Sequence, residues 1–199
     1  MRKMLVGLLC GLFLTLCFFV LASANFPPYS SSLFQKKFVS VFGYEFVANH
    51  IRSIELATNL YNSFPRYEMG RGIFPDYFGG AYIDFESGRF VVLLVEGVAT
   101  PDVFSESSVM SVVGMGSAGG VIVRGVTYSY RQLTETKEYI RSALMKCDNY
   151  AENISSFRID IVSNRVVVEL VVYDDVQVEL FENNIFKSSI LDFRRCRDV

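Results

Sequence analysis

Residues 83–95 and 159–171 of this chain read IDFESGRFVVLLV and IDIVSNRVVVELV. The two stretches align without a gap at an offset of 76, and eight of the 13 positions carry the same residue. Agreement at that level over an ungapped window indicates an internal duplication. The sequence therefore predicts one folding unit that is present twice.

Each stretch has the pattern of a β-hairpin. Short apolar runs flank Ser87-Gly88 in the first copy and Ser163-Asn164 in the second. Gly and Asn tolerate the positive φ angle that a tight turn requires. The aspartate before each turn and the arginine after it would face each other across the strands. We therefore interpret this pair of charges as structural and not catalytic.

Each hairpin is followed by a helix and one more strand. The first copy continues with a short helix from Thr100, which precedes a proline, and with a strand over residues 121–128. The second copy continues with a helix that Asp174 and Gln177 cap, and with a strand over residues 189–193. One face of that second helix is expected to be formed by Val178, Phe181 and Ile185.

A helix over about 130–147 joins the two copies, and Ser129 with Gln132 forms its capping box. The order of elements is then ββαβ–α–ββαβ. This order predicts an α+β fold in which helices lie on one face of antiparallel or mixed sheets. The buried stripe of the joining helix is expected to consist of Leu133, Ile140, Leu144 and Cys147.

The predicted domains are an N-terminal helical segment with a linker over residues 25–76 and the duplicated domain over residues 77–199. The copies within that domain span about 77–128 and 154–199. Apolar residues recur at helical spacing along the N-terminal segment, and Gly43 interrupts them.

The first 24 residues have the pattern of a secretory signal peptide. Arg2 and Lys3 supply the positive charge, residues 4–21 are almost wholly apolar, and Ala22 and Ala24 form a cleavage site. We expect cleavage after Ala24 and a secreted or extracytoplasmic protein. The alternative is a membrane anchor at residues 4–21, since that run is about long enough to span a bilayer.

Charge and cysteine content limit the partners. The chain has 19 basic and 21 acidic side chains, a formal net charge of −2 that becomes −4 once Arg2 and Lys3 are removed. A mildly acidic protein without a basic stripe is not expected to bind nucleic acid. Cys147 and Cys196 survive processing and could form a disulfide that stabilises the fold by about 4 kcal/mol. Two unpaired thiols are the alternative.

No catalytic, cofactor-binding or metal-binding residues are predicted. The glycine pattern at residues 114–119 leads into a β-branched strand, so no helix N-terminus would meet a phosphate. His50 is the only histidine, and its neighbours Ile51 and Ile54 are packing residues. One histidine and two distant cysteines do not supply a zinc site. The acidic residues near Asp174 lack the pattern of a calcium loop. We therefore expect a protein that is not an enzyme.

Several of these motifs resemble the prodomains of secreted bacterial serine peptidases of the α-lytic protease and streptogrisin type. Residues 75–84 and 88–93 are similar to the strand, tight turn and valine-rich strand of those prodomains. Residues 126–129 match a strand that enters a helix, and residues 160–168 match the repeated hairpin. The resemblance covers residues 74–193.

The resemblance implies a non-catalytic module. In that family the prodomain templates the folding of the adjoining protease and inhibits it, by pairing a sheet edge with the enzyme and leaving its C-terminal tail in the active-site cleft. Docking of this kind is β-augmentation. Because the sequence ends at Val199, where the protease would begin, we expect a stand-alone module that acts in trans.

The functional hypothesis is therefore a secreted protein-interaction module, a peptidase-binding inhibitor or folding aid. The alternative is an extracytoplasmic binding protein for an envelope component or a small ligand. A protein partner is expected to meet the aromatic residues around Gly79-Gly80 and the segment 189–199. The expected contact residues are Tyr77, Phe78, Tyr82, Ile190, Leu191 and Phe193.

Overall fold

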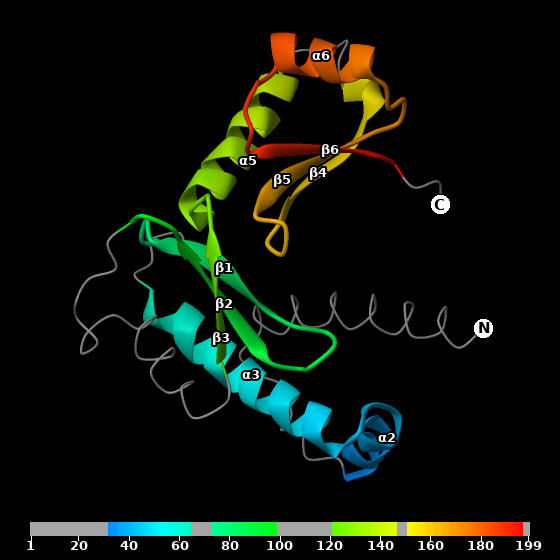
Figure 1. Ribbon diagram of the computed structural model, residues 1–199. Coiled ribbons are helices and arrows are strands. Elements are labelled where there is room, and N and C mark those ends of the chain that lie inside the picture. Colours follow the sequence, from blue (N-terminus) through cyan, green and yellow to red (C-terminus); the bar gives the residue numbers. More distant parts are fainter. Residues whose placement is uncertain (1–31, 65–72, 99–120, 147–150, 197–199) are drawn as a thin grey trace. The chain divides into compact units, whose positions relative to one another are not determined.

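The computed structural model describes residues 32–64, 73–98, 121–146 and 151–196 (Figure 1). The chain divides into two units, at residues 1–44 and 45–199. Helix α2 (Ser32–Phe42) ends at Gly43, whose φ of 85° is left-handed, and helix α3 (Tyr44–Ser63) begins directly after it. No helix within the four described ranges combines the length and the apolar composition that crossing a membrane requires.

The larger unit contains two three-stranded sheets of the same design, and the fold is α+β with a duplicated arrangement. In each sheet the first two strands are antiparallel, and the third is parallel to the central one. The first sheet consists of β1 (Phe78–Ile83), β2 (Phe90–Val95) and β3 (Val121–Val126). The second consists of β4 (Ile154–Asp160), β5 (Arg165–Leu170) and β6 (Leu191–Arg195).

The pairing register repeats the sequence duplication. The register shift in the first hairpin lies between Phe78 and Gly80, and that in the second lies 76 positions later, between Ile154 and Ser156. The third strands are also equivalent, because Phe90 pairs with Val121 as Val166 pairs with Leu191. Their offset is 70, since the second copy has a shorter connection.

Both turns have the predicted positive φ, 69° at Gly88 and 54° at Asn164. The carboxylate of Asp84 accepts hydrogen bonds from the backbone N–H and the Oγ of Ser87, at 3.0 and 2.6 Å. The expected cross-strand ion pair with the arginine after the turn is replaced in the second copy. There Asp160 binds Arg194 on β6 at 3.0 Å.

Helix α3 packs against the first sheet, and the two share one hydrophobic core. One face of α3 packs against this sheet, and Ser53 Oγ donates to the carbonyl of Gly88 at 2.8 Å (Figure 1). Burial of one large apolar side chain contributes about 1.5–3 kcal/mol. The buried members of this core are Leu56, Leu60, Phe64, Phe78, Ala81, Phe90 and Val92.

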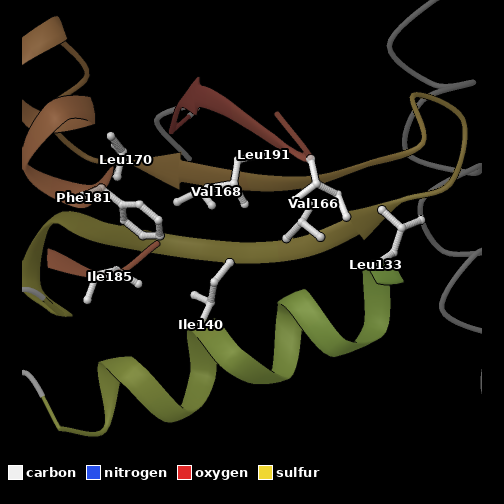
Figure 2. Packing of buried hydrophobic residues seen from close by; sticks show 9 residues of the cluster. Leu133, Ile140, Val166, Val168, Leu170, Phe181, Ile185 and Leu191 are labelled. Carbon is white, nitrogen blue, oxygen red and sulfur yellow. The ribbon is translucent and has the colours of Figure 1, made fainter. Parts of the chain in front are cut away.

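Helices α5 (Tyr130–Leu144) and α6 (Asp175–Asn184) cover one face of the second sheet. Figure 2 shows Leu133 and Ile140 of α5 pointing toward the second sheet, in which β5 carries Val166 and Val168. Phe181 and Ile185 complete this core, as the apolar spacing predicted. The capping box of Ser129 and Gln132 is formed. In α6, the N-cap Asp174 accepts from the N–H of Gln177 at 2.8 Å.

Asn164 makes a contact that the pattern did not predict. This residue is 3% exposed, and its side chain bonds to both backbone groups of Tyr128. Its Oδ1 accepts from the N–H and its Nδ2 donates to the C=O, each at 2.8 Å. The turn of the second hairpin is thereby tied to the segment that leads from β3 into α5.

Four features predicted above lie outside the described residues. They are the signal peptide, the helix that starts at Thr100, the glycine pattern at residues 114–119 and Cys147.

Candidate functional site

The face of the second sheet that points away from α5 and α6 carries the candidate site. Val166, Val168 and Leu170 pack against the helices. Since side chains alternate along a strand, the intervening residues point the other way. We call this side the polar face, and its residues are Ser156, Arg158 and Asp160 of β4, Arg165, Val167 and Glu169 of β5, and Asp192 and Arg194 of β6.

Glu169 lies at the centre of the first hydrogen-bond network on the polar face. Its Oε2 accepts from Ser156 Oγ at 2.7 Å, and its Oε1 accepts from Arg158 Nη2 at 3.2 Å. The hydrogen bond from Ser156, together with Arg158, holds the pKa of Glu169 below its ordinary value. Glu169 is therefore ionised at neutral pH, and each of its oxygens accepts one of these hydrogen bonds.

Arg194 forms the second network and reaches from β6 across β5 to β4. Its Nε donates to Asp192 Oδ2 at 2.8 Å, and its Nη2 donates to Asp160 Oδ2 at 3.0 Å. Burial raises the pKa of Asp160, but hydrogen bonds from Ser163 and Arg194 outweigh it, so that the pKa stays below its ordinary value. The strands of this sheet are thus joined by side chains as well as by their backbones.

A depression of about 400 Å³ opens on this sheet between the two networks. It is lined by Arg158, Glu169, Arg194 and Arg195. Arg195 is exposed, and within the described ranges its side chain has no hydrogen bond or ion pair. Three arginine residues and one glutamate therefore line the depression.

Strand β6 is also a free edge, because in the described part of the chain it has β5 as its one neighbour. The carbonyl of Ile190 and the N–H of Cys196 bond inward, to Val166 and Leu170. Backbone groups alternate in direction along a parallel strand. Those of Phe193 and Arg195 consequently point outward, where another strand could pair.

The first sheet has a different surface at the equivalent positions. Leu93 stands where the second sheet has Glu169, and Ile122 stands where it has Asp192. The strand-spanning arginine is kept, since Arg124 Nη1 donates to Tyr82 Oη at 2.8 Å. The charges of Glu169 and Asp192 are thus a property of the second copy alone.

The structure corrects half of the predicted partner contacts. Phe78, Ile190 and Leu191 are 0%, 4% and 9% exposed and belong to the two hydrophobic cores. A side chain in the core has no area to offer a partner. Three predicted contacts remain half-buried at the surface, and these are Tyr77, Tyr82 and Phe193.

The four residues that line the depression were missed by the sequence reasoning. A signal was present, since charged residues occupy alternate positions in Arg158-Ile159-Asp160 and Asp192-Phe193-Arg194. The pairing of β4, β5 and β6 is what brings these charges together.

The remaining candidates for a chemical role are the cysteines and the single histidine. Cys196 follows β6, and its thiol donates to Ser155 Oγ at 3.0 Å. Because Cys147 lies outside the described residues, the disulfide stays a prediction. His50 stacks on Phe46 within α3, and burial lowers its pKa. Among the residues that the structure describes, no group of three or more His, Cys, Asp and Glu side chains could hold a metal ion.

Two protein-family models match the chain. Residues 31–126 match a Pro-like N-terminal domain, which spans the N-terminal helices and the first sheet. Residues 131–195 match a Pro-like C-terminal domain, which spans α5 and the second sheet. No curated protein was found to match. The chain is therefore similar, in that order, to a Pro-like N-terminal domain and a Pro-like C-terminal domain, and has the organisation of a propeptide-like module.

Proposed function

We propose that this protein is an exported, non-catalytic module that binds a secreted serine peptidase in trans and inhibits it or assists its folding. The observation that carries the proposal is the free edge of β6 within the Pro-like C-terminal domain. The leader-like residues 1–24 support export, and the hairpin motifs support a peptidase as the partner.

Strand addition is the binding mode that this edge favours. The outward backbone groups of Phe193 and Arg195 can exchange hydrogen bonds with an extended segment of the partner. Such bonds supply affinity without depending on the partner's sequence, whereas the flanking side chains supply specificity. The edge is short and carries Arg194 and Arg195, which disfavours pairing between two copies of this chain.

The C-terminal segment contains the strand that the sequence predicts over residues 189–193, and the structure places it at Leu191–Arg195 as β6. We therefore assign residues up to Arg195 to edge pairing. A segment that reaches a partner's active-site cleft would have to lie beyond Cys196.

Substitution of Arg195 by proline tests the edge directly. Proline removes the outward N–H of this residue and leaves the inward bond of Cys196 to Leu170 in place. Arg195→Ala is the matched control, because it removes the guanidinium and keeps the N–H. We expect Arg195→Pro to weaken inhibition of chymotrypsin-like secreted peptidases at least 100-fold, and Arg195→Ala at most about tenfold, since lost backbone pairing affects the whole edge.

Circular dichroism and thermal melts must first establish that both variants are folded. Inhibition by the proline variant that matches the alanine variant would rule out docking at the β6 edge. If the wild-type protein neither inhibits nor refolds any such peptidase, the peptidase proposal fails, and a binding role toward an envelope component or small ligand is favoured.

A further inference from the structure

We propose that this protein forms a symmetric dimer in which the β3 edges of two copies pair antiparallel, so that the first sheets of both copies become one continuous sheet. The proposal concerns the first sheet and goes beyond the binding of a peptidase at β6. Its basis is the exposure, the composition and the register of Val121–Val126.

Strand β3 is an open edge of the first sheet. In the part of the chain that the structure describes, β2 is its one neighbour. Val123, Arg124 and Gly125 are consecutive exposed residues, and Val123 is 45% exposed. The opposite edge differs, because residues 78–81 of β1 are all buried. A further strand therefore has better access to β3 than to β1.

The backbone of β3 presents alternate residues to this open side. The N–H of Glu96 donates to the carbonyl of Val126 at 2.9 Å, so Val126 bonds inward, toward β2. Backbone groups alternate in direction along a parallel strand, and those of Val121, Val123 and Gly125 consequently point outward. Each of these three residues has an N–H and a C=O that a further strand could pair with.

The composition of β3 gives it little protection against pairing. Natural edge strands carry charges that oppose contact with a second edge. In β6 these charges are Asp192, Arg194 and Arg195, whereas β3 has Arg124 alone. Arg124 also reaches away from the open side, because its Nη1 donates to Oη of Tyr82 on β1 at 2.8 Å. Pairing between two copies is therefore disfavoured at β6 and not at β3.

A second charged side chain lies beside β3 and has the opposite sign. Glu96 follows β2, and its side chain occupies the space into which a Cβ of Gly125 would project. Since side chains alternate along a strand, Glu96 lies on the face of the sheet opposite to Arg124. Two copies that meet at this edge therefore bring together no excess of like charge.

A two-fold axis through Val123 makes the pairing self-complementary. Val123 then pairs with Val123 of the second copy, and Val121 pairs with its Gly125, so that all three outward-facing residues are used. In this register Arg124 lies opposite Ile122 of the second copy and not opposite another arginine, which would be destabilising. The pairing closes at two copies, because each copy uses the same edge.

Sedimentation velocity of the purified protein tests the dimer, over about a hundredfold range of concentration around micromolar values. A single strand pair is a small interface, so we expect a reversible dimer with a dissociation constant in the micromolar range. Val123→Pro removes an outward N–H and should weaken the dimer at least about 100-fold. Val123→Thr is the matched control, because it keeps the N–H and the β-branched shape, and should weaken the dimer at most about threefold.

A cysteine at the two-fold axis tests the register. Directly opposite residues of a hydrogen-bonded antiparallel pair have Cα atoms about 5.5 Å apart, which a disulfide can span. Val123→Cys should therefore form a disulfide between two copies under mild oxidation, and mass spectrometry of the joined peptide identifies it. Val162→Cys, at an exposed position in the second hairpin turn, is the control and should form far less.

A wild-type protein that stays monomeric over the whole range would overturn the dimer. Equal association of Val123→Pro and Val123→Thr would do the same, as would a disulfide no more abundant at residue 123 than at residue 162. The cysteine comparison decides the question even if circular dichroism shows that Val123→Pro does not fold. The peptidase proposal stands or fails separately, because Val123 and Arg195 belong to different sheets.

Discussion

At the scale of single residues, Asn164 has two structural roles, and the sequence pattern predicts only the first of them. Its φ of 54° makes the hairpin turn, which is the task that the pattern identifies. Its amide also holds both backbone groups of Tyr128, at 2.8 Å each. An amide can do this because it carries a donor and an acceptor side by side. The equivalent residue in the first copy, Gly88, has no side chain with which to make such bonds.

Substitution of Asn164 separates these tasks. Asn164→Gly keeps the turn conformation and loses both hydrogen bonds, which should cost about 1–3 kcal/mol. Asn164→Asp should cost more at pH 7, because a carboxylate oxygen would replace the Nδ2 donor and face the carbonyl of Tyr128. Urea denaturation followed by circular dichroism measures both. An aspartate variant as stable as the wild type would show that the amide contact does not contribute.

At the scale of elements, the first hairpin turn is a docking surface for α3. Gly88 has a φ of 69°, and a Cβ built on it would lie 2.7 Å from the carbonyl oxygen of Phe46. Ser53 Oγ and Asn49 Nδ2 donate to the carbonyls of Gly88 and Ser87, at 2.8 and 3.2 Å. Glycine is therefore required here for close approach as well as for its backbone angle.

The substitution Gly88→Asn installs the residue of the equivalent turn and should destabilise the protein by about 1–3 kcal/mol, because Asn accepts the φ but its Cβ collides with α3. Gly97→Asn is the matched control. Gly97 has a similar φ of 74°, and a Cβ added there would meet nothing within 4 Å. Chemical denaturation should show a clear excess cost for Gly88→Asn. Equal costs for the two variants would contradict the docking of the turn on α3.

At the scale of the whole molecule, two copies of one unit have kept their hydrogen-bond register and diverged on one sheet face. The second copy has charges where the first has Leu93 and Ile122. Its polar face includes two acidic groups with a lowered pKa, Glu169 and Asp160. Charge on this face therefore contributes to folding stability.

These groups predict how stability depends on pH. A carboxyl whose pKa is lower in the folded state stabilises the protein above its unfolded value, and the gain is lost as the pH falls through the folded value. With ordinary pKa values of 4.5 for Glu169 and 3.8 for Asp160, the melting temperature should begin to fall below about pH 5. Each partly exposed group contributes no more than about 1 kcal/mol.

Ser156→Ala removes the hydrogen bond that contributes most to the lowered pKa of Glu169. The melting temperature of this variant should therefore fall less between neutral and acidic pH than that of the wild type. Glu135→Gln, at an exposed position of α5, is the control and should leave the profile unchanged. Calorimetry between about pH 3 and pH 7 spans the range in which these carboxyl groups titrate and provides the comparison. A steeper loss in Ser156→Ala than in the wild type would contradict the assignment.

The hairpins, the two positive-φ turns, the caps at Ser129 and Asp174 and the burial of Leu133, Ile140 and Phe181 were predictable from the sequence. The signals for these features are local, since period, turn chemistry and caps involve residues a few positions apart. The exact correspondence of β3 and β6 was not predictable, because these strands are 70 positions apart and not 76 as the hairpins are. Their equivalence is defined by how they pair with β2 and β5, and not by shared residues. The candidate site was missed for the same reason.

By itself, then, the sequence determined a duplicated α+β chain with strands and helices near their observed positions. Only the tertiary structure decided that Phe78, Ile190 and Leu191 are core residues, and that Arg158, Glu169 and Arg194 from three strands meet on one polar face. The physical reason is the separation in sequence between the residues that interact. Alternation tells which residues share a side of their own strand, but burial and the meeting of charges depend on which strands pair and on which side the helices cover.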